Sequence, residues 1–156
     1  MKLKLIILLL VFFGWSVEVY PKSPGRHFMT PAKSTCTSLG GTWGSIYGSC
    51  KATFHIAKKI CRASGGRVPT QNEVEKLIRS CGGTVKFDDV GEVSANYDSW
   101  SYTRCYRDHG FPRARKYHWT TTKVKGIPES RRTVNMEDRN FRWQSNHYRA
   151  TVACIR

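Results

Sequence analysis

Cysteine is the residue type with the clearest chemistry in this chain of 156 residues. Six cysteines stand at positions 36, 50, 61, 81, 105 and 154. A structural zinc site needs cysteines in close pairs such as C-x-x-C, and even the tightest spacing here, between Cys50 and Cys61, is far wider. The even number instead predicts three disulfides in an exported protein, although six cysteines allow fifteen pairings and spacing alone does not choose among them.

The other groups that could do chemistry form no catalytic motif. Five histidines, at positions 27, 55, 109, 118 and 147, are scattered, and we expect them to pack or to lie on the surface. The sequence contains no G-x-S-x-G, phosphate-binding loop or H-E-x-x-H motif. We therefore predict a protein that is not an enzyme and that has no cofactor.

The remaining chemical signal is basic and aromatic, and it lies between Asp88 and Lys116. This segment shows no periodicity, and a loop of such length is usually functional or covalently tethered. Arginines among aromatic rings suit stacking and the binding of phosphate, sulfate or carboxylate groups. The alternative is a generally basic surface whose aromatic side chains fill the core. The predicted ligand-binding residues are Trp100, Tyr102, Arg104, Tyr106, Arg107, Arg113, Arg115 and Lys116.

Overall composition agrees with a basic, folded, single-domain protein. The chain has 26 Lys and Arg against 11 Asp and Glu, a net charge of +15, which predicts attraction to anionic polymers or surfaces. Its aromatic content of 12% provides enough bulky apolar surface for a core and excludes wholesale disorder. A multidomain enzyme is not expected at this length.

The N-terminus has the pattern of a secretory signal. Two lysines precede an apolar run from Leu5 to Phe13, and small residues follow, so we expect residues 1–16 to be a signal peptide cleaved after Ser16. The run is too short to span a bilayer comfortably. Residues 17–34 contain three prolines and predict an exposed arm, and residues 35–156 form the predicted domain. The expected location is secreted or periplasmic.

Two helices are predicted from their boundary residues. Thr53 can cap a first helix of about ten residues that Gly65-Gly66 ends. Thr70 and Glu73 form a capping box that begins a second helix, and Gly82-Gly83 ends it. The apolar positions of both helices recur at intervals of three and four residues, which indicates one buried face each.

Short strands complete the predicted elements. Residues 36–50 are rich in glycine and predict a small hairpin or looped strand pair that its two terminal cysteines could close. Alternating patterns at residues 84–87, 117–120 and 133–136 predict strands, and residues 151–155 predict a more fully buried one. The fold class expected from these elements is α+β.

The element order and several short motifs resemble the C-type lectin-like domains of bacterial intimin- and invasin-type adhesins. Residues 57–70, AKKICRASGGRVPT, are similar to the family's cysteine-bearing helix and its G-G-R-L-P-T turn, with Val68 in place of Leu. Residues 117–122, YHWTTT, resemble its Y-x-W-T-S-T strand, and residues 149–156, RATVACIR, its terminal Y-V-T-C-V-R strand. These motifs are spread over most of residues 36–156. The resemblance implies a C-type lectin-like fold with two short helices, small antiparallel sheets and a long loop, crosslinked by disulfides.

The same resemblance implies a disulfide pairing. The family bridge between the first helix and the final strand corresponds to Cys61 with Cys154, and a local hairpin bridge of longer members corresponds to Cys36 with Cys50. This leaves a third pair, Cys81 with Cys105, which would tether the long loop to the end of the second helix.

Calcium is not expected, because the family's ligand triplets are missing. Sugar-binding members hold calcium through an E-P-N or Q-P-D triplet and a W-N-D triplet, since hard cations need clustered oxygen ligands. The nearest segments here, residues 127–129 (IPE) and 143–146 (WQSN), offer one carboxylate between them. The acidic residues Asp88, Asp89 and Glu92 are explained more simply as a solvated loop. We predict no metal site.

The function expected from the resemblance is that of a secreted or periplasmic bacterial binding module, like an adhesin or lectin. Its partner would be a protein receptor or an acidic glycan, recognised without calcium. The alternative is a cationic envelope or defence factor that adsorbs to lipopolysaccharide, anionic lipid or another polyanion through charge. Nucleic acid is the least expected partner for an exported protein.

Overall fold

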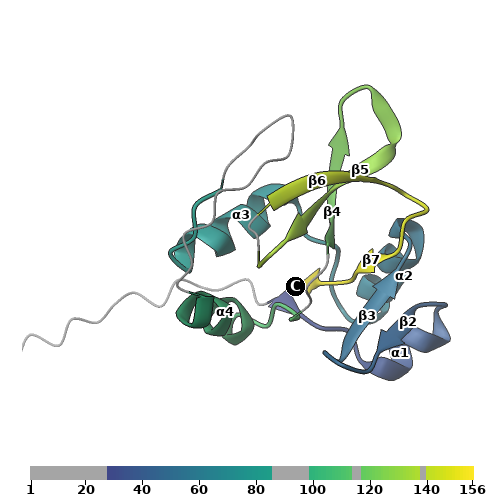
Figure 1. The fold of residues 1–156 in the computed structure, drawn as a ribbon. Coiled ribbons are helices and arrows are strands. Elements are labelled where there is room, and N and C mark those ends of the chain that lie inside the picture. Colours follow the sequence, from purple (N-terminus) through teal and green to yellow (C-terminus); the bar gives the residue numbers. More distant parts are fainter. Residues whose placement is uncertain (1–27, 86–98, 114–116, 138–139) are drawn as a thin grey trace, which may run out of the picture.

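A computed structural model of the chain describes residues 28–85, 99–113, 117–137 and 140–156. Within these ranges the chain has a mixed α+β fold of short helices and two sheets, as predicted (Figure 1). The helices are α1 (Lys33–Ser38), α2 (Phe54–Ala63), α3 (Gln71–Ser80) and α4 (Ser99–Asp108). The strands are β1 (Phe28–Met29), β2 (Thr42–Gly44), β3 (Ser49–Ala52), β4 (His118–Val124), β5 (Ile127–Asn135), β6 (Asn140–Ser145), β7 (Ala150–Thr151) and β8 (Cys154–Ile155). No helix in these ranges has the length and apolar run that a bilayer crossing requires.

The larger sheet joins the two halves of the chain. Its strand order is β2-β3-β7-β4-β5-β6, and its pairs are antiparallel except for β4 and β7, which are parallel. The short strand β7 therefore connects the β2–β3 hairpin to the three strands β4, β5 and β6. A separate two-stranded sheet pairs β1 with β8, which brings the first described strand beside the C-terminal strand (Figure 1).

The start of the described chain is folded against the domain. We expected residues 28–34 to belong to an exposed arm, but Phe28 pairs with Ile155 and is buried. Its ring packs edge-on against Phe111, with the ring centroids 5.1 Å apart. Burial of a large aromatic ring explains why this segment is held in place. The predicted signal peptide and residues 17–27 lie outside the described residues.

The two predicted helices are present as α2 and α3. At α3 the hydroxyl of Thr70 accepts a hydrogen bond from the backbone N–H of Glu73, and the Glu73 carboxylate accepts one from the backbone N–H of Thr70, so the capping box is confirmed. Thr53 precedes α2 as predicted, but its side chain makes no capping hydrogen bond. Gly65 and Gly82 follow the two helices with φ values of 78° and 79°, a conformation that glycine adopts at little cost.

Helix α4 lies in the segment that we predicted to be an irregular loop. Tyr102 and Tyr106, one helical turn apart, are buried, and their rings meet edge-on with centroids 5.4 Å apart. Trp100 and Arg104 lie on the exposed side of the same helix. Aromatic residues on both sides of α4 conceal the periodicity from which an amphipathic helix is usually recognised.

Two smaller predictions are corrected. Strands β2 and β3 form the predicted hairpin, with Trp43 opposite Cys50, but Cys36 lies in helix α1 instead of at a strand end. Thr84 and Val85 are irregular and do not begin a strand. The rest of that predicted strand, residues 86–87, lies outside the described residues.

The core has two parts on opposite sides of the β4–β6 strands. One contains side chains of α3, α4, β5 and β6, including Ile78, Tyr106 and Phe141. The other contains side chains of α2, β3 and β4, with the fully buried Trp119 at its centre. The indole N–H of Trp119 donates a 2.7 Å hydrogen bond to the carbonyl oxygen of Ala52, so its polar group is satisfied inside the core.

Three disulfides connect these elements in the pairing that the resemblance implied. Their sequence separations are 14, 93 and 24 residues for Cys36–Cys50, Cys61–Cys154 and Cys81–Cys105. The first bridge joins α1 to β3, the second joins α2 to the C-terminal strand β8, and the third joins the end of α3 to α4.

Candidate functional site

The GGRVPT segment, one of the motifs that carry the resemblance, has a structural role. The backbone N–H of Arg67 donates to the carbonyl oxygen of Ile155 at 2.9 Å, and the N–H of Ile155 donates back at 2.8 Å. The carbonyl oxygen of Pro69 accepts a 2.8 Å hydrogen bond from Thr121 in β4. A Cβ atom on Gly66 would lie 2.5 Å from the Ile155 carbonyl oxygen, so only glycine fits there. The segment therefore ties the α2–α3 connection to β4 and β8.

An ion pair completes this connection. The guanidinium of Arg67 donates to both carboxylate oxygens of Glu73, at 2.8 and 2.5 Å, and the backbone N–H of Thr70 donates to the same group. The Arg67 hydrogen bond is the main reason that the pKa of Glu73 is lowered to about 2, with the Thr70 backbone adding to it against partial burial. Bidentate, charge-assisted bonds of this kind are among the stronger ones in proteins.

We expect Glu73→Gln to lower the free energy of unfolding at pH 7 by about 1–2 kcal/mol, because half of the Arg67 side chain is exposed and water screens the pair. Since the pKa of Glu73 is lowered in the folded state, its contribution is present above about pH 4.5 and is lost as the pH falls toward 2. Urea denaturation at pH 7 and pH 3 measures both effects. Glu75→Gln is the control, because that carboxylate accepts a hydrogen bond from the Gln71 side chain. A Glu73 variant as stable as this control would contradict the prediction.

The predicted ligand-binding residues of α4 divide between core and surface. Tyr102 and Tyr106 are buried, so they support the fold and cannot contact a ligand at the surface. Trp100 is 74% exposed, with the Arg104 guanidinium 6.0 Å from its ring centroid. Arg104 also lies 3.9 Å from the carboxylate of Asp108, which offsets part of its charge. Arg107 is exposed on the same helix.

The remaining predicted residues follow α4. The guanidinium of Arg113 lies 5.5 Å from the ring centroid of Tyr47, in the turn between β2 and β3. Arg113 therefore lies over an aromatic ring that is distant from it in the sequence. Arg115 and Lys116 lie outside the described residues, as do Asp88, Asp89 and Glu92.

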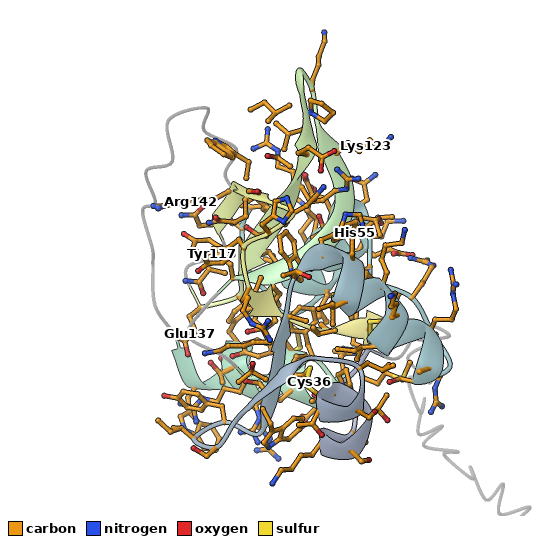
Figure 2. The ribbon with its side chains drawn as sticks, turned by 90° about the vertical axis from the view of Figure 1, so that its right-hand side faces the viewer. Cys36, His55, Tyr117, Lys123, Glu137 and Arg142 are labelled. Carbon is orange, nitrogen blue, oxygen red and sulfur yellow. A yellow bond between two sulfur atoms is a disulfide. The ribbon has the colours of Figure 1, made fainter. Side chains whose placement is uncertain are left out.

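A second group of arginines and aromatic rings lies on one side of the β4–β6 strands. We call this group the arginine face, and its members are Arg131, Arg142, Tyr117 and Phe54. Arg131 stands 4.8 Å from the ring centroid of Phe54, and Arg142 stands 5.8 Å from that of Tyr117. Figure 2 shows Tyr117 and Arg142 together at one side of these strands.

Strand register explains why these arginines share a side. Thr133 is opposite Arg142, and Arg131 is two residues from Thr133 on β5, so Arg131 and Arg142 are diagonal neighbours on one face. Among the described residues, no carboxylate lies within salt-bridge distance of either guanidinium. Arg131 is held further by hydrogen bonds to the carbonyl oxygens of Pro128 and Ser130, at 2.9 and 2.8 Å.

The prediction of binding residues did not include the arginine face. No spacing in the sequence marks these arginines, because their neighbours in the structure lie on different strands. The sequence does indicate that Arg131 and Thr133 share one face of a strand, because they are two residues apart. The same holds for Tyr117 and Trp119. Only the strand register shows that these two pairs lie on the same face of the sheet.

The two segments that we compared with calcium triplets meet in the structure. The Asn146 side-chain amide donates a 3.1 Å hydrogen bond to the Glu129 carboxylate, and the Asn146 backbone N–H donates to the Glu129 carbonyl oxygen at 2.7 Å. The Asn146 carbonyl oxygen in turn accepts from the backbone N–H of Phe54, the first residue of α2. These bonds connect the first part of β5 and the residue after β6 to the start of α2. The carboxylate of Glu129 lies at this junction.

One histidine is fully buried. The Nδ1 atom of His118 lies 3.3 Å from the carbonyl oxygen of Val134, and its ring packs on Phe111 with centroids 4.8 Å apart. Burial, partly offset by hydrogen bonding to the carbonyls of Val134 and Pro112, lowers the pKa of His118 to about 4. The ring is therefore neutral at pH 7 and belongs to the core. It has no surface from which to reach a substrate.

Comparison with protein-family models, with curated proteins and with solved structures found no match to this chain. The candidate site is therefore defined by its own geometry, a pair of arginines that each lie over an aromatic ring on one face of a disulfide-crosslinked α+β domain.

Proposed function

We propose that the described domain has a C-type lectin-like fold. Three observed features support this proposal. The first and last described strands pair, Cys61 of the first long helix bonds to Cys154 in the last strand, and the GGRVPT segment connects that helix to a second one. Because the first and last described strands are joined, long loops between the other elements can lie on the surface without exposing the core.

We further propose that the protein is an exported bacterial binding module without catalytic activity, and that its arginine face binds an acidic glycan. The observation that carries this proposal is the pair of guanidiniums over aromatic rings, Arg131 and Arg142, on one strand face with no described carboxylate within salt-bridge distance. Attraction to a ring holds a guanidinium in place, and its N–H groups that have no partner in the protein stay available for a carboxylate or sulfate. One terminal nitrogen of Arg131 already donates to the carbonyl oxygens of Pro128 and Ser130, so its other nitrogens would bind the ligand.

Calcium is not needed in this proposal, because a guanidinium can bind the anionic group of an acidic sugar directly through charge-assisted hydrogen bonds. The partly exposed ring of Tyr117 adds apolar surface beside Arg142, whereas the ring of Phe54 is buried and supports Arg131 from within the fold. A sugar ring that carries an acidic group has an apolar face that can pack on an aromatic ring and an anion that can bind a guanidinium. We therefore expect binding to acidic polysaccharide to persist in the presence of EDTA.

The test uses heparin as a sulfated probe, polygalacturonate as a carboxylated probe and dextran as a neutral one. We expect Arg142→Gln to weaken binding to one of the acidic probes about tenfold at about 150 mM salt, where surface charges more than a Debye length apart are largely screened. Arg79→Gln is the matched control, because it removes the same charge from an exposed position on α3. Equal affinity of the two variants for both acidic probes would overturn the proposal.

Helix α4 provides the comparison within the same protein. The double variant Arg104→Gln/Arg107→Gln removes two exposed charges from the predicted loop site and leaves the arginine face intact. If this variant loses affinity while Arg142→Gln does not, the site lies on α4. A loss confined to Arg142→Gln supports the arginine face.

The net charge of +15 favours a second candidate, a cationic envelope or defence factor that adsorbs to lipopolysaccharide or anionic lipid by charge alone. The affinity of such adsorption falls steeply between low and physiological ionic strength. Each arginine substitution then lowers the affinity by the same amount, wherever the arginine lies. Selective binding to a protein receptor, with no affinity for either acidic probe, would favour the adhesin function with a different partner.

A further inference from the structure

The three disulfides differ in their access to solvent. Cys36, Cys50, Cys61 and Cys154 are each 0% exposed, so both of their bridges are sealed inside the core. Cys81 and Cys105, in contrast, are both partly exposed. Thiol–disulfide exchange needs direct access of a thiolate to one sulfur atom, so the Cys81–Cys105 bridge is the one that an external thiol can reach.

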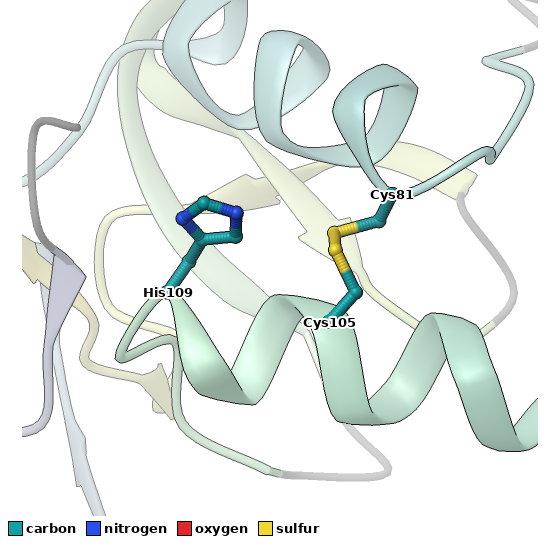
Figure 3. A group of neighbouring side chains, drawn as sticks. All are labelled: Cys81, Cys105 and His109. Carbon is teal, nitrogen blue, oxygen red and sulfur yellow. A yellow bond between two sulfur atoms is a disulfide. The ribbon is translucent and has the colours of Figure 1, made fainter. Parts of the chain in front are cut away.

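An imidazole lies beside this accessible bridge. A ring nitrogen of His109 and the two sulfur atoms all lie within 4.8 Å of one another. The backbone N–H of His109 donates to the carbonyl oxygen of Cys105 at 3.2 Å, which places the imidazole one helical turn after that cysteine. Figure 3 shows the histidine and the disulfide together in the space between α4 and α3.

We propose that Cys81–Cys105 is a site of thiol–disulfide exchange with external thiols, and that His109 assists the exchange as a proton donor to the departing sulfur. The substrate class is a thiol or dithiol reductant. This inference is independent of the proposed binding function, because it depends on none of the residues of the arginine face.

The reaction balances with a dithiol as the reductant. One thiolate of the dithiol attacks Sγ of one cysteine, forms a mixed disulfide with it and breaks the Sγ–Sγ bond. The electron pair of that bond passes to the other Sγ, and His109 supplies the proton that turns it into a thiol. The second thiol of the reagent, after losing its proton, then attacks the mixed disulfide. The second cysteine leaves as a thiolate and takes up the proton that the second thiol of the reagent released, so the protein gains two thiols and the dithiol is oxidised to a cyclic disulfide.

The experiment is limited reduction of the folded protein with dithiothreitol, followed by alkylation and mass mapping of the modified cysteines. We expect Cys81 and Cys105 to be alkylated while both core bridges stay oxidised. His109→Gln should slow reduction of this bridge about fivefold or more, because exchange is faster when the leaving sulfur is stabilised or protonated. His147→Gln is the matched control, an exposed histidine on the turn after β6.

Each outcome is decisive. Reduction of all three bridges together, or of a core bridge first, would overturn the proposed site. An unchanged rate in His109→Gln would overturn the role of the histidine. Intact core bridges in the mass map show that the variant is folded, so a slow rate cannot be attributed to a misfolded protein.

Discussion

The double variant Cys61→Ala/Cys154→Ala is expected to lose about 4–5 kcal/mol of unfolding free energy. This bridge spans 93 residues of sequence, and removing a crosslink over so long a loop restores a large conformational entropy to the unfolded chain. Both cysteines are also fully buried, so the smaller side chains leave unfilled space in the core. A loss of this size is a large fraction of the total stability of most domains.

Denaturation in guanidinium chloride, monitored by tryptophan fluorescence, measures this loss. The control is Cys36→Ala/Cys50→Ala, whose bridge is equally buried but spans 14 residues, so we expect a smaller loss of about 3 kcal/mol. Equal losses in the two variants would show that the length of the closed loop does not determine stability here.

Acidification from pH 7 to pH 4 is expected to destabilise the protein by about 3 kcal/mol through His118 alone. The pKa of this histidine is lowered to about 4 in the folded protein, against 6.5 for the unfolded side chain. The unfolded chain therefore binds a proton that the folded chain does not, so the contribution of the neutral ring is present above about pH 6.5 and is lost as the pH falls toward 4.

The measurement is a series of urea denaturations between pH 7 and pH 4 for the parent and for His118→Gln. Glutamine keeps a donor for the carbonyl oxygen of Val134 but has no proton to gain in this range. We expect the variant to be less stable at pH 7 and to show a flatter dependence on pH. Parallel curves for the two proteins would contradict a neutral, buried His118. The contribution of Glu73 to stability is lost only below about pH 4.5, so it affects only the most acidic points of this series.

Local signals in the sequence were enough for the two central helices. Thr70 and Glu73 are three residues apart, so their capping box depends on almost nothing outside the segment. The glycines after both helices adopt a conformation that disfavours other residues, so they too could be recognised from sequence alone. The disulfide pairing was implied by the resemblance, while the spacing of the cysteines left fifteen choices open.

Helix α4 was missed because its stability comes mainly from tertiary contacts. Its buried side is made of two tyrosines that pack into a core formed by other elements, and a disulfide joins Cys105 to the end of α3. Neither contact has a local sequence signal. As a result, the predicted ligand-binding residues included Tyr102 and Tyr106, which the structure places in the core.

What the sequence alone determined is the α+β class, the boundaries of α2 and α3 and the excess of positive charge, because these depend on neighbouring residues or on composition. The tertiary structure decided which arginines lie side by side. Arg131 and Arg142 become neighbours through the pairing of β5 with β6, and their rings come from α2 and from the residue before β4. Contacts between residues distant in sequence are fixed by strand register and helix packing, and no local pattern specifies these.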